Sequence, residues 1–333
     1  IQGELHDSEA LNRLCQQSDI VTFDLENVGA DILMTLADHG VEMIPAPSTI
    51  RLIQNKFDQK CHYQSNSIPT ADFFDLGDDC TFSDLERFGL PCVQKAHTGG
   101  YDGRGVHVIR SCDDWSNRLK TKSFIERFVS GGMELAVMVA RRKSGEMVAY
   151  DPVEMVVDPQ LNLLDYLIAP ARISAELRRK AQELAKRTVE SFGTSGLFGV
   201  ELFVTESGDL LVNEVAPRAH NSGHHTIEAC VTSQFENQLR ACLDLPLGST
   251  ELRGIALTAN LVGASGYIGS PVVEGLDEFS QIADAHIHLY GKNECRRGRK
   301  MGHLTLIGSD YDELIRRLET IRKNLIIRGE APQ

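Results

Sequence analysis

The feature that most restricts how this chain can fold is the stretch 199–214, where apolar and polar residues alternate on both sides of Ser207-Gly208. Such alternation predicts two half-buried strands, and a Ser-Gly pair between them is typical of a two-residue hairpin turn. That turn would place Glu201 and Glu214 directly opposite each other. Since facing residues of a hairpin have Cβ atoms about 5 Å apart, we expect the two carboxylates to lie together on one face.

Two carboxylates so close repel each other, so a positive charge is expected between them. Divalent cations such as magnesium prefer oxygen ligands, and Asn213 and Asn221 offer more oxygens nearby. The hairpin has no Cys or His in a ligand position, which favours magnesium over zinc. Two exposed glutamates on an edge hairpin are the ordinary alternative, but Glu201 and Glu214 both alternate with apolar residues. The sequence therefore predicts a magnesium site at this pair.

Length and composition limit the classes of protein to consider. With 333 residues the chain exceeds the usual size of one core, so two or three domains are expected. A net charge of −13 would repel nucleic acid, and no apolar run approaches the roughly 20 residues that span a membrane. The 8 cysteines are scattered without a C-x-x-C pair, and no secretory signal is visible. We expect a cytoplasmic protein that binds neither nucleic acid nor membranes.

Hydrophobic periodicity divides the chain into three regions. Residues 1–47 alternate helices at 8–17 and 28–38 with strands at 20–24 and 41–44, the order of a parallel βαβ sheet whose first strands are expected to precede residue 1. Residues 48–246 start with a helix at 48–64, have a long helix at 174–191, and are otherwise rich in strands, at 71–75, 91–97, 105–109, 123–128, 133–141, 146–157, 197–205 and 210–216. Residues 250–333 follow a linker and hold strands at 255–262, 285–289 and 302–308 and a helix at 310–324. The fold class expected is therefore α/β and α+β.

A glycine-rich segment, 98–105, separates two of these strands. It lacks the G-K-[ST] ending of a P-loop, and no helix follows it, so neither a P-loop nor a Rossmann turn applies. Glycine lets a backbone approach phosphate closely, although an ordinary mobile hairpin is the default alternative. Lys95 precedes the loop and Lys56 lies on the preceding helix. Both ammonium groups are therefore expected to reach one anion.

Further candidates for ligand binding lie downstream of this loop. Backbone groups at the strand end 126–129 are suited to read adenine, and the Glu134 carboxylate could accept hydrogen bonds from ribose hydroxyls, although a surface strand residue is its ordinary alternative. The basic run 296–300 is flanked by glycine in an acidic chain, which favours a phosphate clamp over a solvated turn.

Three long motifs resemble those of one enzyme family. They are Gln94-Lys-Ala-His-Thr-Gly-Gly-Tyr-Asp-Gly-Arg-Gly105, Asn213-Glu-Val-Ala-Pro-Arg-Ala-His-Asn-Ser-Gly-His224, and Tyr290-Gly-Lys followed by Arg296-Arg-Gly-Arg-Lys-Met-Gly-His303. With the Glu-x-x-Val run at 126–129, they resemble the 5-(carboxyamino)imidazole ribonucleotide synthases of purine biosynthesis over nearly the whole chain. The resemblance implies an ATP-grasp fold: a truncated Rossmann-like substrate domain at 1–47, an ATP-grasp domain at 48–246, and a small C-terminal domain at 250–333 that contributes to the substrate phosphate site.

The same resemblance implies a reaction and a set of site residues. The reaction joins bicarbonate to aminoimidazole ribonucleotide through carboxyphosphate, uses ATP and Mg²⁺, releases ADP and phosphate, and is carried out by a homodimer. For ATP it implies Lys56, Lys95, Gly100, Tyr101, Asp102, Gly103, Glu126, Phe128, Val129 and Glu134, and for magnesium Glu201 and Glu214. It implies Arg218, His220 and Asn221 as catalytic residues that hold bicarbonate, and Glu26, Tyr101, Asp102, Lys292, Arg299 and Lys300 as ligands of the ribonucleotide. The Arg218 fork matches a carboxylate, and His220 is suited to act as a base.

Some features depart from the family pattern. The Gly-rich opening turn is absent, Val106 replaces the usual Gln, and Asp24 replaces the first glutamate of a Glu-x-Glu-Asn motif. Two alternatives remain open: another ATP-grasp ligase, such as a formate-dependent glycinamide ribonucleotide transformylase or a biotin carboxylase, and a nucleotide-binding module without catalysis. The Tyr101-Asp102 insertion argues against both ligases, and the missing turn alone supports the module.

Overall fold

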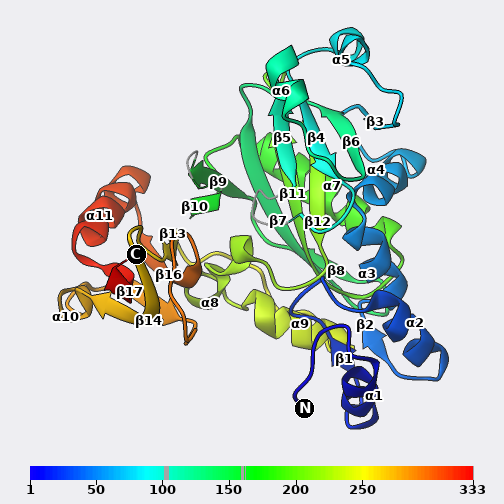
Figure 1. Ribbon diagram of the computed structural model, residues 1–333. Helices are drawn as coiled ribbons and strands as arrows, with labels where there is room; N and C mark the ends of the chain where they lie inside the picture. The colour runs from blue at the N-terminus through cyan, green and yellow to red at the C-terminus, as the bar shows by residue number, and fades with distance from the viewer. Residues whose placement is uncertain (101–104, 159–160, 162, 333) are drawn as a thin grey trace.

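The computed structural model describes residues 1–100, 105–158, 161 and 163–332 (Figure 1). The first residues form the expected small α/β unit, made of α1 (Ser8–Gln16), β1 (Val21–Thr22), α2 (Ala30–Asp38) and β2 (Met43–Ile44). The two strands pair in parallel, as the βαβ pattern predicts. Phe23, Leu33 and Ile50 are buried in the core of this unit.

The single helix predicted at 48–64 is two helices, α3 (Pro47–Gln54) and α4 (Lys56–Ser65). Asn55 between them is extended, and its side-chain oxygen accepts the backbone N–H groups of Phe57 at 3.1 Å and Asp58 at 3.2 Å. Asparagine is among the best residues for capping a helix start in this way. The break makes Lys56 the first residue of α4, where its backbone N–H also donates to the His97 carbonyl at 2.7 Å.

A small antiparallel sheet follows, in the order β3-β6-β4-β5. Its strands are β3 (Phe73–Asp75), β4 (Cys92–Ala96), β5 (Val106–Ile109) and β6 (Ser123–Arg127), and it has two short helices that the periodicity did not predict, α5 (Phe82–Phe88) and α6 (Cys112–Ser116). All four strands were predicted, with ends shifted by a few residues. Leu85, Cys92, Ile109 and Ile125 are buried between this sheet and its helices.

The described residues also form a large sheet in the order β12-β11-β7-β9-β10-β13-β16-β15, with β8 paired to β7. Its strands are β7 (Met133–Arg141), β8 (Met147–Ala149), β9 (Val153–Asp158), β10 (Leu163–Ala169), β11 (Gly196–Val204), β12 (Leu210–Ala216), β13 (Ile255–Val262), β15 (Ala285–Leu289) and β16 (Lys300–Gly308). The predicted strand 146–157 is thus two strands. No strand was predicted at β10, yet β10 pairs with both β9 and β13 and joins the C-terminal strands to the rest.

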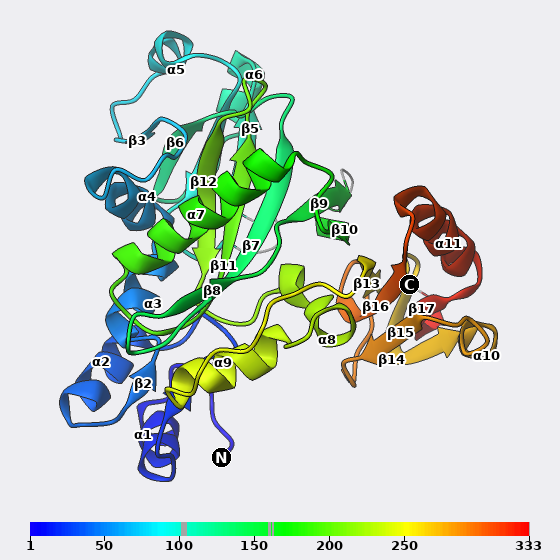
Figure 2. The same cartoon turned by 180° about the vertical axis from the view of Figure 1, so that it is seen from behind.

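One face of the β7–β11–β12 part of this sheet is covered by α7 (Ala175–Ser191) (Figure 2). Phe198, Val200 and Leu202 of β11 point to that face and are buried with Leu184 of α7. Because side chains alternate along a strand, Glu201 belongs to the opposite face. That face is partly covered by α9 (Gln234–Cys242), which packs on β7 and β11.

The C-terminal region packs α11 (Tyr311–Asn324) on β13 and β16 through Leu314, Leu318 and Ile321, as its periodicity predicts. It also holds a two-stranded sheet of β14 (Tyr267–Glu274) and β17 (Ile326–Pro332), and the short helix α10 (Leu276–Phe279). A short helix that precedes the linker, α8 (Thr226–Ala229), contacts β16. Among the described residues, none of the helices has the length and apolar character to cross a membrane.

Candidate active site

The turn of the β11–β12 hairpin differs from the prediction. The Thr205 N–H donates to the Asp209 carbonyl at 2.9 Å, so these two residues close the loop and three residues lie between them. Gly208 has φ +84, the left-handed conformation that such a three-residue loop requires and that glycine adopts at little cost. The predicted two-residue turn is therefore wrong, and Leu202 pairs with Val212.

A β-bulge further along the hairpin brings the two glutamates together by another route. The register shifts between Val200, which faces Val215, and Leu202. Both Asn213 and Glu214 therefore lie opposite Glu201. The Asn213 side-chain amide donates to Glu201 Oε2 at 3.2 Å. The one-to-one pairing of the glutamates is wrong, but the bulge still sets Glu214 against Glu201, close enough for its charge to raise the pKa of Glu201.

The two carboxylates ionise very differently. Burial, and then the charge of Glu214, raise the pKa of Glu201 to about 8. Burial also acts to raise the pKa of Glu214, but the nearby charges of Lys56 and Lys95 outweigh it and the pKa is lowered. Buried carboxylates of like charge separate their ionisation in this manner. At neutral pH Glu214 is thus ionised while Glu201 retains a proton.

Both predicted phosphate-binding lysines lie beside this pair. The Lys56 ammonium donates to Glu214 Oε2, and the ionised Glu214 keeps the pKa of Lys56 raised although burial acts to lower it. Lys95 Nζ lies 2.6 Å from Glu126 Oε2 and 2.9 Å from Asn213 Oδ1. The lysines come from α4 and β4, so the small sheet and the large sheet meet across these contacts.

Lys60, which is only 3% exposed, belongs to the site although the sequence motifs did not predict it. Its ammonium donates to Glu126 Oε1 at 2.5 Å and to Thr70 Oγ1 at 2.7 Å. Burial lowers the pKa of Lys60 to about 8, whereas Lys95 and Lys60 together lower the pKa of Glu126 against the effect of its burial. The available signal was that Lys60 follows Lys56 by one helical turn and so shares its face.

The N-terminal unit reaches the same site through Glu26. The Arg218 guanidinium donates from Nε to Glu26 Oε2, and this contact lowers the pKa of Glu26 although burial opposes it. The Asn221 amide donates to Asn260 Oδ1 of β13 at 2.8 Å, and the Asn260 amide donates to the Leu164 carbonyl of β10 at 2.6 Å. Glu26, predicted to bind the ribonucleotide, and Arg218, predicted to bind bicarbonate, are thus neighbours.

His220 lies against the glutamate pair. Its Nε2 is 3.7 Å from Glu201 Oε1, and its Nδ1 is 2.8 Å from Ser222 Oγ. Burial, and then the charge of Arg218, lower the pKa of His220 to about 4, so the imidazole is neutral at pH 7. Gly199 permits this approach, since a Cβ there would lie 2.8 Å from the Cβ of His220.

Comparison with known proteins identifies the family to which this chain belongs. Family models match residues 1–54 as a ribonucleotide synthetase preATP-grasp domain, 61–235 as an ATP-grasp domain, and 256–317 as a phosphoribosylaminoimidazole carboxylase C-terminal domain. The N5-carboxyaminoimidazole ribonucleotide synthase of Bacillus subtilis is 36% identical, over 96% of this chain and 83% of the relative. This chain belongs to the N5-carboxyaminoimidazole ribonucleotide synthase family.

Solved structures of the synthase family agree in fold. The Thermotoga maritima synthetase has a TM-score of 0.90 and 42% identity, covering 98% of this chain and 87% of that one. The Aspergillus clavatus synthase, in complex with ADP and 5-aminoimidazole ribonucleotide, has a TM-score of 0.87 and 33% identity, covering 96% of this chain and 85% of that one.

The phosphoribosylaminoimidazole carboxylase of Schizosaccharomyces pombe is 37% identical over 96% of this chain but only 59% of its own length. The chain thus spans about three fifths of such curated relatives.

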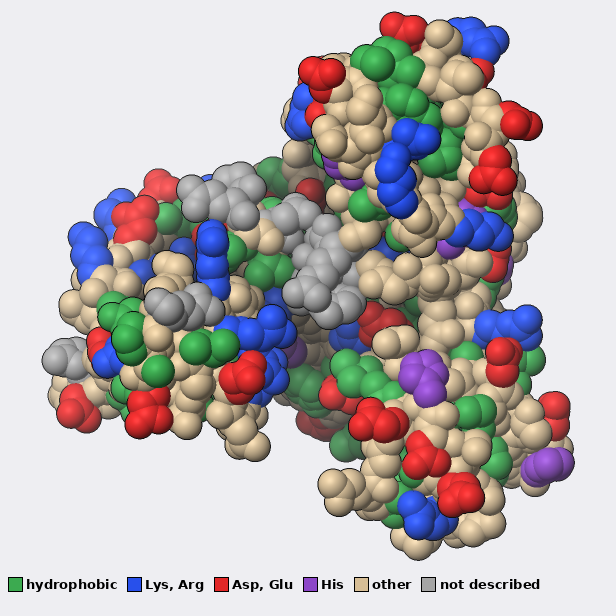
Figure 3. Space-filling view, viewed as in Figure 1, with side chains coloured by type: hydrophobic (Ala, Val, Ile, Leu, Met, Phe, Trp, Pro, Cys, Tyr) green, Lys and Arg blue, Asp and Glu red, His purple; other side chains and the backbone are tan. Residues whose placement is uncertain are grey.

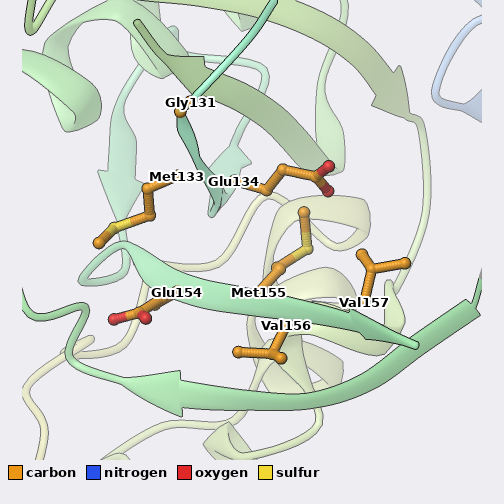
Figure 4. A pocket seen from close by; sticks show the side chains of 8 residues that line it. Gly131, Met133, Glu134, Glu154, Met155, Val156 and Val157 are labelled. Atoms are coloured by element: carbon orange, nitrogen blue, oxygen red, sulfur yellow. The ribbon is translucent and has the colours of Figure 1, made fainter. Parts of the chain in front are cut away.

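A hollow of about 410 Å³ lies beside Glu134 in this synthase-family chain. Its lining comes from β7, β9 and the turn before β7: Gly131, Gly132, Met133, Glu134, Glu154, Met155, Val156 and Val157. Figure 4 shows Glu134 on the same side of the strands as Met155 and Val157. Glu134 pairs with Phe203 of β11, so it also shares the face of Glu201, and burial raises its pKa. Phe128 and Val129 directly follow β6.

The three side chains predicted to bind the phosphate of the substrate, Lys292, Arg299 and Lys300, make different contacts. Lys300 is close enough to His220 to lower the pKa of that ring. Lys292 donates to the Lys300 carbonyl at 2.6 Å, whereas Arg299 donates to the Glu294 carbonyl at 3.0 Å. Figure 3 shows Lys and Arg side chains gathered where the C-terminal region borders a hollow in the surface.

The glycine loop of the synthase motif is described only at its ends. Gly100 is described and lies close to Gly105, where an added Cβ would be 3.2 Å from the Gly100 Cα. The predicted ligands Tyr101, Asp102 and Gly103 lie outside the described residues.

The ion cluster around Glu126 predicts a large stability effect. Glu126→Gln would leave two buried ammonium groups beside a neutral amide, so we expect the free energy of unfolding to fall by about 3–5 kcal/mol in urea titrations. Glu154→Gln is the matched control, because Glu154 is also buried but its partner Arg172 is 39% exposed. Its loss is expected to be clearly smaller, and equal losses in the two variants would contradict the importance of the cluster.

Proposed function

We propose that this chain catalyses the carboxylation of 5-aminoimidazole ribonucleotide by bicarbonate, giving N-carboxyaminoimidazole ribonucleotide, with ATP converted to ADP and phosphate. The observation that carries the proposal is the meeting of two clusters. The glutamate pair with Lys56 and Lys95 suits the phosphate end of a nucleoside triphosphate. His220 lies 3.7 Å from Glu201, and Arg218 is near enough to lower the pKa of the His220 ring. The substrates named with the Aspergillus clavatus complex and the relatives' names support it.

The chemistry explains why these groups are needed. Bicarbonate is a poor electrophile, so transfer of the γ-phosphoryl group of ATP to its oxygen would give carboxyphosphate with a good leaving group. The substrate amine then attacks the carboxyl carbon, the C–O bond to phosphate breaks, and the amine loses a proton. Positioning and charge neutralisation supply most of the catalysis of phosphoryl transfer.

The residues around Glu201 and Glu214 fit a magnesium ion. No group of three or more His, Cys, Asp or Glu side chains able to hold a metal occurs within the described parts of the chain. Magnesium does not need one, because it commonly uses one or two carboxylates together with substrate phosphates and waters. The Lys56 ammonium on Glu214 is in keeping with a carboxylate placed to accept a cation. When bound, the ion would neutralise charge on the ATP phosphates.

The remaining roles follow the clusters. For ATP we propose Lys56, Lys95, Gly100, Tyr101, Asp102, Gly103, Glu126, Phe128, Val129 and Glu134. Because the Glu126 carboxylate already accepts from Lys60 and forms an ion pair with Lys95, its part is to hold the lysines, leaving adenine to backbone groups of the strand end. Arg218, His220 and Asn221 would bind bicarbonate and carboxyphosphate. The ribonucleotide would be bound by Glu26, Tyr101, Asp102, Lys292, Arg299 and Lys300. We propose that the chain has three domains, at residues 1–47, 48–246 and 250–333.

We also propose a homodimer. Exposed apolar side chains follow one another along α9 and beyond it, at Phe235, Leu239 and Leu243, with exposed fractions of 39%, 58% and 57%. A row of this kind is costly to leave in water and is typical of an interface. A mass of 36.8 kDa in sedimentation equilibrium at all concentrations would exclude the dimer.

For the location of the protein we propose the reducing cytoplasm, which the free thiols among the described residues support.

Release of ADP tests the proposed reaction. The wild type should release ADP with aminoimidazole ribonucleotide and bicarbonate, and not with glycinamide ribonucleotide and formate. Glu214→Gln removes a charge that the phosphate end needs, so turnover should fall on the order of 100-fold or more. Glu206→Gln, an exposed position on the loop of the same hairpin, is the control and should keep its activity. Full activity of Glu214→Gln would rule out the metal site.

The raised pKa of Glu201 predicts how magnesium binding depends on pH. A carboxyl group whose folded pKa rises from 4.5 to about 8 holds an extra proton in the metal-free native state across that range. Metal-free stability contributed by this proton is therefore lost as pH rises through about 8. Magnesium requires the ionised form, so its binding at pH 7 with nucleotide should release a proton, and its affinity should rise with pH.

Calorimetry in two buffers of different ionisation enthalpy measures that proton. Glu201→Gln cannot release it, and Glu206→Gln should behave as the wild type. Equal heats in both buffers for the wild type at pH 7 would contradict the shared-proton interpretation of the pair.

A further inference from the structure

His220 is held in place by one side chain that the proposed reaction does not use. Gln234, the first residue of α9, is fully buried. Its Oε1 accepts the backbone N–H of His220 at 3.0 Å, and its Nε2 donates to the backbone carbonyl of His220 at 2.9 Å. A single amide thus satisfies both backbone groups of His220, as a neighbouring strand would do.

Gln234 is itself fixed on several sides. Its backbone N–H donates to Thr226 Oγ1 at 2.8 Å, and the Thr226 hydroxyl donates to the Gly223 carbonyl at 2.6 Å. A Cβ at Gly223 would lie 2.3 Å from Gln234 Oε1, so the turn after His220 has room for this amide only because residue 223 is glycine. The loop and the glutamine are therefore built around each other.

A stack of imidazole rings orients the other side of the amide. Gln234 Nε2 lies 3.1 Å from His224 Nδ1. The His224 ring stacks on His303 of β16 at 4.5 Å, and His303 stacks on His288 of β15 at 4.6 Å. The Tyr290 hydroxyl contacts His303 Nδ1 at 2.9 Å. The support of Gln234 thus extends into the C-terminal strands, including the strand that begins at Lys300.

We propose that Gln234 is the positioning residue for His220: it fixes the backbone of His220 and thereby where the imidazole faces Glu201. This inference rests on the proposed function, in which His220 acts at the bicarbonate end. Gln234 reaches the reaction only through His220. Its loss should therefore weaken bicarbonate use selectively, whereas Lys56 and Lys95 at the nucleotide end keep their own contacts.

Kinetics with a matched control test the selectivity. Gln234→Leu keeps the size but removes both hydrogen bonds, and the KM for bicarbonate should rise roughly 10- to 100-fold, as expected for a small displacement of a reacting group, with the KM for ATP unchanged. Gln238→Leu, one turn further along α9, loses contacts of 3.1 Å to Thr22 Oγ1 and 3.4 Å to the Phe23 carbonyl and should leave both constants unchanged. Equal changes in the two KM values for Gln234→Leu would overturn the proposal.

Gln234→Glu supplies a conservative variant if Gln234→Leu folds poorly. Only the protonated carboxyl can donate to the His220 carbonyl, so its activity relative to the wild type should increase as pH falls. A constant ratio across pH would count against the proposal.

An arm independent of activity uses histidine ring NMR. The His220 resonance, identified by its loss in His220→Asn, should shift in Gln234→Leu and stay in place in Gln238→Leu. If the wild type fails to carboxylate aminoimidazole ribonucleotide, the proposed function fails while this measurement still decides on Gln234. An unmoved His220 resonance in Gln234→Leu would refute the positioning role.

Discussion

The site depends on a balance of charge between two sheets. Glu126 is buried between two lysines, and the more accessible Glu214 lies against a third, Lys56. Each carboxylate is stable there because an ammonium group lies within hydrogen-bonding distance, and each ammonium needs its carboxylate equally. The pairs join α4, β4, β6 and β12, so the charges that suit the site for phosphate also connect the small sheet to the large one.

Much of the local structure could be predicted from the sequence. Alternating residues indicated most strands of the small and the large sheet, although β10 was not predicted and β8 and β9 were predicted as one strand. The α11 period predicted which leucines are buried. The prediction that Glu201 and Glu214 lie together was right for a partly wrong reason. The loop has one more residue than a Ser-Gly turn implies, and a bulge at Asn213 offsets the shift. A bulge has little local sequence signal, because it depends on which neighbouring strand the chain meets.

Other features depend on contacts between distant residues. The helical spacing puts Lys60 on the face of Lys56, but its burial and its ion pair depend on Glu126 and Thr70, which are distant in sequence. Gln234 has no motif of its own, and its importance comes from the glycine and histidines of a separate loop. The strand β10 has an apolar run too short to separate strand from helix by period alone, and its two neighbours decide the outcome. The family resemblance supplied the reaction, which no periodicity contains.

The position of β10 has a mechanical consequence. Since it is hydrogen-bonded to both β9 and β13, a continuous series of paired strands runs from the strand that starts at Lys300 to the strand that holds Glu201. Hinging the C-terminal region away would break backbone hydrogen bonds along a whole strand, which is expensive in a buried sheet. The sheet therefore fixes the distance between the Lys300 end and the Glu201 end of the site. A ligand must match that spacing by its own length, while the small sheet, held mainly through side chains, is the part free to adjust.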